Sequence, residues 1–101
     1  REAPVHVGVC RMTFHLQGND SLKGKRQVSR SLIGRLRQRF NLAVAEVDAI
    51  DVYQRLVIGL TCVSNDVRHA NEMLDAAIRF AEEHQADAEL VDVEREIIDG
   101  A

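Results

Sequence analysis

The stretch QRLVIGLTCVSND, residues 54–66, decides how this chain folds. Its residues 54–64 are rich in Leu, Val and Ile and contain no Pro, which is typical of a long β-strand. The polar run 64–66 supplies side chains that cap helix N-termini. Apolar residues then recur at helical spacing from Val67 to about His84. The stretch therefore predicts a long strand that passes directly into a helix.

The residues on either side predict a hairpin before this unit and an edge strand after it. Residues 42–47 are short, apolar and strand-like, and residues 48–53 join them to the long strand through a loop of several residues. Residues 88–98 carry a charge at nearly every other position, which protects an edge strand from aggregation.

The N-terminal part predicts another strand and another helix. Apolar residues alternate from Val5 to Leu16, and the alternation changes phase near residues 8–10, which favours a bulge there. Ser21 is the expected N-cap of an amphipathic helix that ends near Asn41.

The six predicted elements follow the order strand, helix, strand, strand, helix, strand. Two right-handed crossovers around a central hairpin give one α+β domain over residues 1–101. The predicted fold is a ferredoxin-like βαββαβ sandwich, with a four-stranded antiparallel sheet and two helices on one face.

The sheet face that the helices leave open is itself apolar along the two central strands. We expect a second copy of the chain to cover it and form a homodimer. The alternative is an open face made tolerable by Arg11, Thr13 and His15. The predicted dimer-interface residues are Val7, Val9, Val57, Thr61 and Val63.

The composition excludes several classes of protein. The 101 residues, 46% apolar and 29% charged, fit one globular domain and exclude a two-domain enzyme. No run reaches the roughly 18 apolar residues of a membrane span, and residues 1–4 do not begin a signal peptide, so we expect a cytoplasmic protein without a membrane partner. Cys10 and Cys62 lie in apolar strands without a zinc or redox motif and are expected as buried thiols.

The net charge of −3 hides a strong asymmetry. Residues 21–40 hold seven basic and no acidic residues, whereas residues 66–101 hold eleven acidic and three basic residues. On a helical wheel, four of the basic side chains fall within about 60°, beside the apolar stripe and next to Gly34. Such a row can follow a phosphate backbone. The predicted nucleic-acid-binding residues are Lys23, Lys25, Arg26, Arg30 and Arg37.

Two alternative roles for the basic helix stay open. The helix could balance the charge of the acidic second helix, or it could bind an acidic protein partner. The aromatic residues are too few for a set of stacking positions, so nucleic acid would be recognised by shape and phosphate. These residues are Phe14, Phe40, Phe80 and Tyr53.

The sequence offers little for catalysis. Glu46, Asp48 and Asp51 could bind Mg²⁺ or act as an acid and base, but a solvated hairpin end accounts for them more simply. The four histidines are scattered, and no glycine-rich phosphate loop is present. We therefore expect no catalytic residues, no metal and no cofactor.

Several runs in one order resemble a known family. They are Ser21-Leu22-Lys23-x-Lys25-Arg26, Leu36-Arg37-x-Arg39-Phe40-Asn41, Ala45-Glu46-Val47-Asp48, Gln54-Arg55 and Val63-Ser64-Asn65-Asp66. Together they resemble the YlxP-like family of small bacterial domains of unknown function. The resemblance implies a ferredoxin-like fold, a bacterial cytosolic setting and no established catalytic role. Genes of that family tend to lie beside those for translation initiation and ribosome maturation factors.

Charge and resemblance together favour one function. We expect a non-enzymatic accessory protein that associates with ribosomal RNA, a ribosomal subunit or a ribosome-assembly intermediate through the basic first helix. The alternative is a self-associating scaffold or small-ligand-binding module that uses the open sheet face.

Overall fold

The computed structural model describes residues 4–83 and 87–100 and confirms the predicted order of elements. Each predicted boundary agrees to within about two residues, except that His84, the expected end of the second helix, lies outside the described residues. The elements are β1 (His6–His15), α1 (Leu22–Arg39), β2 (Ala43–Asp48), β3 (Arg55–Ser64), α2 (Val67–Glu83) and β4 (Glu89–Asp99).

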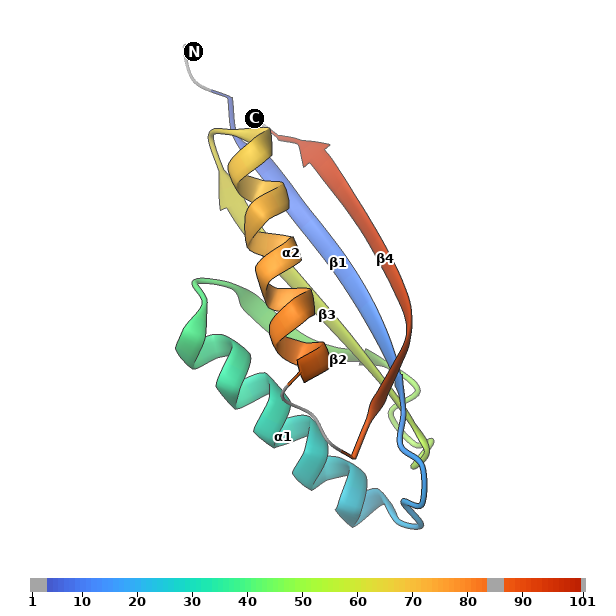
Figure 1. Cartoon of the computed structure of the whole chain (residues 1–101). Coiled ribbons are helices and arrows are strands. Elements are labelled where there is room, and N and C mark those ends of the chain that lie inside the picture. The colour runs from blue at the N-terminus through green and yellow to red at the C-terminus, as the bar shows by residue number, and fades with distance from the viewer. Residues whose placement is uncertain (1–3, 84–86, 101) are drawn as a thin grey trace.

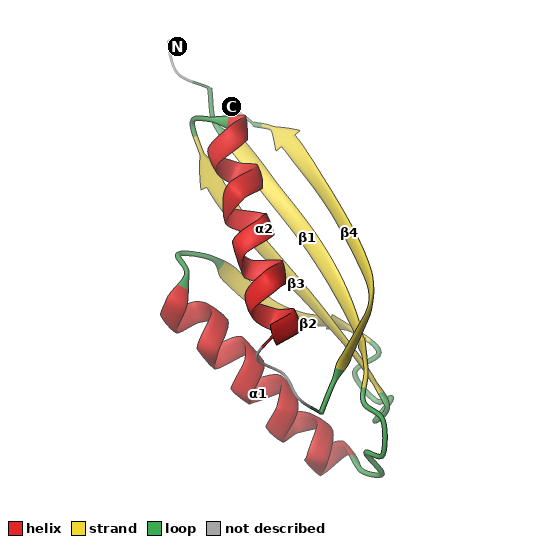
Figure 2. Cartoon of the chain, in the orientation of Figure 1, coloured by secondary structure: helices red, strands yellow, loops and turns green. Residues whose placement is uncertain are grey.

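The four strands form one antiparallel sheet in the order β2-β3-β1-β4. Both helices cover the same face of this sheet (Figure 1), and the colouring by secondary structure in Figure 2 separates the helical layer from the sheet. The ferredoxin-like α+β arrangement is thereby confirmed. The ten-residue strands β1 and β3 are central, and the molecule is 52 Å long.

β1 is a regular strand, and the predicted bulge near residues 8–10 is wrong. It pairs with β3 without a register shift from His6 to His15. The two apolar sets that suggest a change of phase are the two faces of one strand, because a central strand is apolar on both sides. Register shifts occur instead against the edge strands, between Thr13 and Phe14 opposite β4 and between Glu46 and Asp48 in β2.

The core lies between the sheet and the helices. α1 packs mainly on β2, while α2 crosses β1 and β3. At Gly8, an added Cβ would lie 2.8 Å from Cys62 Sγ of β3 and 3.2 Å from Leu74 Cδ1 of α2, so these two side chains leave no room for another. The fully buried core side chains include Cys10, Met12, Phe14, Leu16, Leu32, Leu36, Leu56, Ile58 and Leu74.

Polar caps begin both helices, as their sequences predict. Ser21 Oγ accepts a hydrogen bond of 3.0 Å from the Gly24 N–H at the start of α1. Asp66 Oδ1 accepts one of 3.0 Å from the Arg68 N–H at the start of α2. Neither helix, within the part of the chain that the structure describes, is long and apolar enough to cross a lipid bilayer.

Candidate nucleic-acid interface

A row of four exposed basic side chains follows the outer flank of α1. Lys23, Arg26, Arg30 and Arg37 share one side of the helix, and at 1.5 Å per residue the row is about 21 Å long. The row lies beside the edge strand β2, because Arg37 Nη2 donates a 2.6 Å hydrogen bond to the carbonyl oxygen of Val44. We call these four residues the basic row.

Three members of the basic row have no acidic partner in the part of the chain that the structure describes. Lys23, Arg26 and Arg30 form no ion pair with any residue in 4–83 or 87–100. Most of the described acidic residues lie on α2 and on β4 at the opposite edge of the sheet. Arg35 and Arg39, on the other flank of α1, line hollows that also contain Asp87 and Glu83, so charge balance with the acidic part of the chain concerns that flank and not the basic row.

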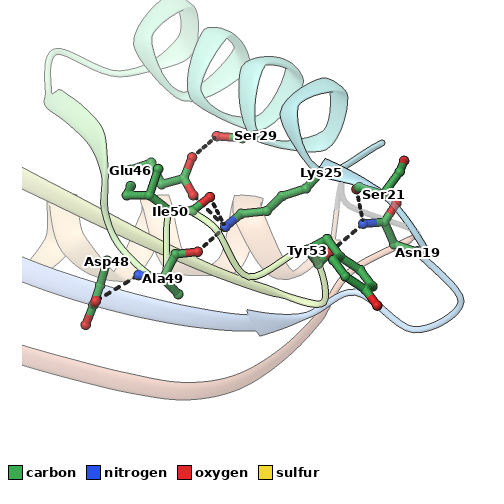
Figure 3. Close-up of polar contacts among 9 residues, drawn as sticks. All are labelled: Asn19, Ser21, Lys25, Ser29, Glu46, Asp48, Ala49, Ile50 and Tyr53. Atoms are coloured by element: carbon green, nitrogen blue, oxygen red, sulfur yellow. Dashed lines mark hydrogen bonds and ion pairs between the residues drawn. The ribbon is translucent and has the colours of Figure 1, made fainter. Parts of the chain in front are cut away.

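Lys25 does not belong to this surface, and its predicted role as a phosphate contact is wrong. Its side chain is only 2% exposed, and its Nζ lies 2.8 Å from Glu46 Oε2. The same ammonium donates to the carbonyl oxygens of Ala49 and, at 3.3 Å, Ile50 (Figure 3). The helical wheel indicates this burial, because it places Lys25 between Leu32 and Leu36 within the apolar stripe.

Glu46 completes this buried polar cluster from β2. Its side chain faces α1 because it follows Val44, a core residue, by two positions in the strand. Ser29 Oγ lies 3.4 Å from Glu46 Oε1, while Oε2 has no described partner besides the Lys25 ammonium. The cluster therefore attaches α1 to the β2–β3 hairpin.

The three candidate carboxylates do not form one site. Glu46 faces the helices, Asp48 pairs with Arg11 on the opposite side of the sheet, and Asp51 is exposed in the β2–β3 loop. The Ala49 N–H, followed by Arg11, lowers the pKa of Asp48 below its ordinary value. Among the described residues, no three His, Cys, Asp or Glu side chains are grouped to hold a metal ion.

The open sheet face carries four of the five predicted dimer-interface residues at least partly exposed. The β1–β3 register places Val7 opposite Val63 and Val9 opposite Thr61 on this face, and Val63 is 65% exposed. Val57, however, is fully buried within the single chain, between Thr13 and Asp48 in the register. The expectation that Val57 contacts a second copy is therefore wrong.

A separate cavity of about 580 Å³ lies on the other flank of α1, away from the open sheet face. Polar side chains from the β1–α1 loop and from α1 line much of it. Any small molecule bound there would contact the helix and not the sheet face that the sequence favours for a ligand. The polar lining residues are Gln17, Asn19, Gln27, Ser31, Arg35 and Asp87.

The family comparison covers most of this architecture. The model of a family described as "Protein of unknown function (DUF503)" matches residues 7–95. The chain belongs to the DUF503 family. The DUF503 match includes both helices, three complete or nearly complete strands and most of β4. The match therefore includes the basic row and the buried polar cluster of Lys25, Ser29 and Glu46.

Other comparisons of this DUF503 domain show its fold alone. No curated protein matches the chain. It is similar to a solved structure of CrmK, a flavoenzyme involved in shunt product recycling in caerulomycin biosynthesis, with 19% identity and a TM-score of 0.57 over 98% of this chain and 20% of that one. The chain thus spans a fifth of that flavoenzyme. The de novo designed protein Foldit4 is similar with 9% identity and a TM-score of 0.53 over 92% and 96% of the two chains.

Proposed function

We propose that this DUF503 domain is a cytoplasmic accessory protein, without catalysis of its own, that binds structured ribosomal RNA or a ribosome-assembly intermediate through the basic row. The single observation that carries the proposal is the exposure of Lys23, Arg26 and Arg30 without an acidic partner among the described residues. Unpaired cations along one helix flank suit a partner that carries regularly spaced negative charge.

The geometry of the row suits phosphate contacts. Its members are spread along about 21 Å of helix, so several phosphates of one strand can be reached together. Arg26 and Arg30 can each bind a phosphate bidentately, whereas Lys23 acts as a point charge. Such contacts position a protein on RNA without reading its sequence.

Two further features support ribosomal RNA as the partner. The acidic edge strand β4 lies at the opposite edge of the sheet, so electrostatic repulsion would turn the basic row toward the RNA. The resemblance to the YlxP-like family, whose genes tend to lie beside those for translation initiation and ribosome maturation factors, favours RNA of the ribosome over other RNA.

The test is a titration of the purified protein against a labelled, structured ribosomal RNA fragment at several salt concentrations. Four phosphate contacts predict a plot of log affinity against log salt with a slope of about −3 to −4. The double variant Arg26→Glu/Arg30→Glu should bind at least about tenfold more weakly, with a slope closer to about −2.

A matched control separates the basic row from net charge. Arg68→Glu/Arg79→Glu changes the net charge equally, at positions on α2. This control should keep the affinity and the salt slope close to those of the parent protein. Equal losses in the two double variants would overturn the assignment to the basic row, and absence of binding by the parent at low salt would overturn RNA binding altogether.

Self-association through the open sheet face is a second candidate. The observation that favours it is the exposure of Val63, at 65%, beside the half-buried Val7 and near Ile98, which is 44% exposed. Contiguous apolar side chains on a flat face suit an interface with a second copy. The two candidates use different surfaces, so both can hold for one molecule.

A further inference from the structure

The β2–β3 loop, residues 49–54, presents apolar side chains to solvent from a firmly held backbone. Ile50, Val52 and Tyr53 are 58%, 48% and 45% exposed. Three such side chains within four residues are unusual for a solvated hairpin end, where polar residues dominate. The composition alone does not show that the ring of Tyr53 is exposed while other aromatic side chains pack against the core.

Hydrogen bonds hold almost every carbonyl of this loop. Those of Ala49 and Ile50 accept from the buried Lys25 ammonium, and that of Ala49 also accepts from the Val52 N–H at 3.0 Å. The side-chain amide of Asn19 donates to the carbonyl of Tyr53. The carbonyls of Val52 and Gln54 accept from the N–H groups of Arg55 and Leu16, at 3.4 and 2.9 Å.

The same contacts place Tyr53 at the N-terminal end of the basic row. The Asn19 amide that holds the Tyr53 carbonyl also donates, at 2.9 Å, to the carbonyl of Ser21, the N-cap of α1. Lys23 is two residues further along the chain. Figure 3 shows the Tyr53 ring extending away from Lys25 and α1, with Asn19 between the loop and the helix start.

We propose that Tyr53 stacks on an unpaired base of the RNA whose phosphates contact the basic row. This inference rests on the proposed function and adds the class of RNA element, a hairpin loop or bulge with an accessible base. Single-stranded RNA offers base faces that stack on aromatic side chains, whereas a duplex hides them. Because the backbone of the loop is already held, stacking costs little additional ordering of the protein.

The charges near the ring determine how such an RNA would approach. Asp51 in the same loop and Asp20 beside Asn19 are exposed and repel phosphates, while Lys23 attracts them from the helix side. The RNA backbone would therefore run along α1 and turn one base toward Tyr53. A protein partner for Ile50 and Val52 is the competing use of this loop, and the basic row beside it favours RNA.

The experiment compares an RNA hairpin with an unpaired loop against a fully paired duplex of matched length and composition. The chain contains one Tyr and no Trp, so its intrinsic fluorescence comes from Tyr53 alone. RNA also lowers the signal by absorbing light, and a titration of free tyrosine amide measures that loss. After this correction, the hairpin should quench the Tyr53 fluorescence and the duplex should not. Anisotropy of labelled RNA gives the affinities of both.

Variants identify the ring as the source of the preference. Tyr53→Ala should lower hairpin affinity about tenfold and leave duplex affinity unchanged. Tyr53→Phe retains the stacking surface and should bind the hairpin like the parent. Val52→Ala, a neighbouring exposed side chain without a planar ring, is the matched control and should also bind like the parent.

Each outcome decides the inference. Unchanged hairpin affinity in Tyr53→Ala, or equal losses in Tyr53→Ala and Val52→Ala, would overturn stacking and leave the loop as a surface for a protein. This failure is distinguishable from failure of the proposed function, because the parent would still bind both RNAs and lose them in Arg26→Glu/Arg30→Glu. A parent that binds neither RNA would overturn both proposals.

Discussion

The ammonium group of Lys25 lies in the interior, where a buried ion costs roughly several kcal/mol unless it is paired. Its partners are the carboxylate of Glu46 and the carbonyls of Ala49 and Ile50, which come from β2 and the loop that follows. The contacts therefore stabilise the relative placement of three segments and not only a charge. Lys25, although a residue type usually found at the surface, links α1 to the β2–β3 hairpin inside the protein.

We predict that Lys25→Met destabilises the protein by about 2–4 kcal/mol, because Glu46 loses its counter-charge inside the structure. The double variant Lys25→Met/Glu46→Leu should recover part of this loss, since both buried charges are removed together. Urea unfolding of the parent, both single variants and the double variant gives the coupling. Additive effects of the two substitutions would show that the pair does not stabilise the fold.

The Cys10 thiol predicts a pH dependence of stability. Burial raises its pKa from 9.0 to about 11, an effect that nearby Arg95 partly opposes. As the pH rises above 9, the thiol of the unfolded chain loses its proton while the folded thiol keeps it, so the unfolded state gains stability.

The free energy of unfolding should therefore fall by at most about 3 kcal/mol as the pH rises from 9 towards 11, and the stabilisation from this thiol is fully present below pH 9. Unfolding in urea across this alkaline range measures it. The variant Cys10→Ala should have a lower free energy of unfolding at every pH, and this free energy should fall less steeply as the pH rises. Parallel curves for the two proteins would contradict the assignment to Cys10.

At the scale of elements, two glycines lower the intrinsic helix propensity of α1, and packing on the sheet offsets this cost. Its two glycines, Gly24 and Gly34, weaken the isolated helix, while Leu32 and Leu36 pack it on the sheet. The glycines have different surroundings. An added Cβ at Gly34 would meet nothing within 4 Å, whereas one at Gly24 would lie 2.2 Å from Asn19 Oδ1.

We predict opposite effects of alanine at these positions. Gly34→Ala should stabilise the protein by about 1 kcal/mol, because it lowers the entropy that α1 loses on folding. Gly24→Ala should give no gain or a loss, since its methyl group displaces the Asn19 side chain from the Tyr53 and Ser21 carbonyls. Thermal unfolding of the two variants tests this, and equal stabilisation would refute the role of Asn19.

At the scale of the whole molecule, charge and apolar surface are separated. The basic row follows α1 beside β2, most of the described acidic residues lie on α2 and β4, and the apolar patch around Val63 occupies the open sheet face. A molecule arranged in this way can bind a polyanion at one edge and a second copy through its face.

The dimer hypothesis makes a prediction about mass in solution. If the open face joins two copies, the parent should sediment as a dimer, and Val63→Glu should sediment as a monomer with a normal circular dichroism spectrum. Val67→Glu, at an exposed valine on α2, is the matched control and should remain a dimer. A parent that stays monomeric at high concentration would exclude this interface.

The sequence by itself determined the six elements, their order and the fold. Periodicity, caps such as Ser21 and Asp66, and the handedness of crossovers are local signals, and neighbouring residues along the chain carry them. The sequence also predicts the basic row, because the helical wheel places its four members on one flank beside the apolar stripe.

Only the tertiary structure decided which charged and apolar side chains remain available. The helical wheel places Lys25 in the apolar stripe, but only the packed fold supplies its partner Glu46, and only the packed fold leaves Val57 fully buried. The held loop around Tyr53 depends on Asn19 and Lys25, which are distant in sequence. These properties arise from contacts between elements, and such contacts exist only after the chain has packed.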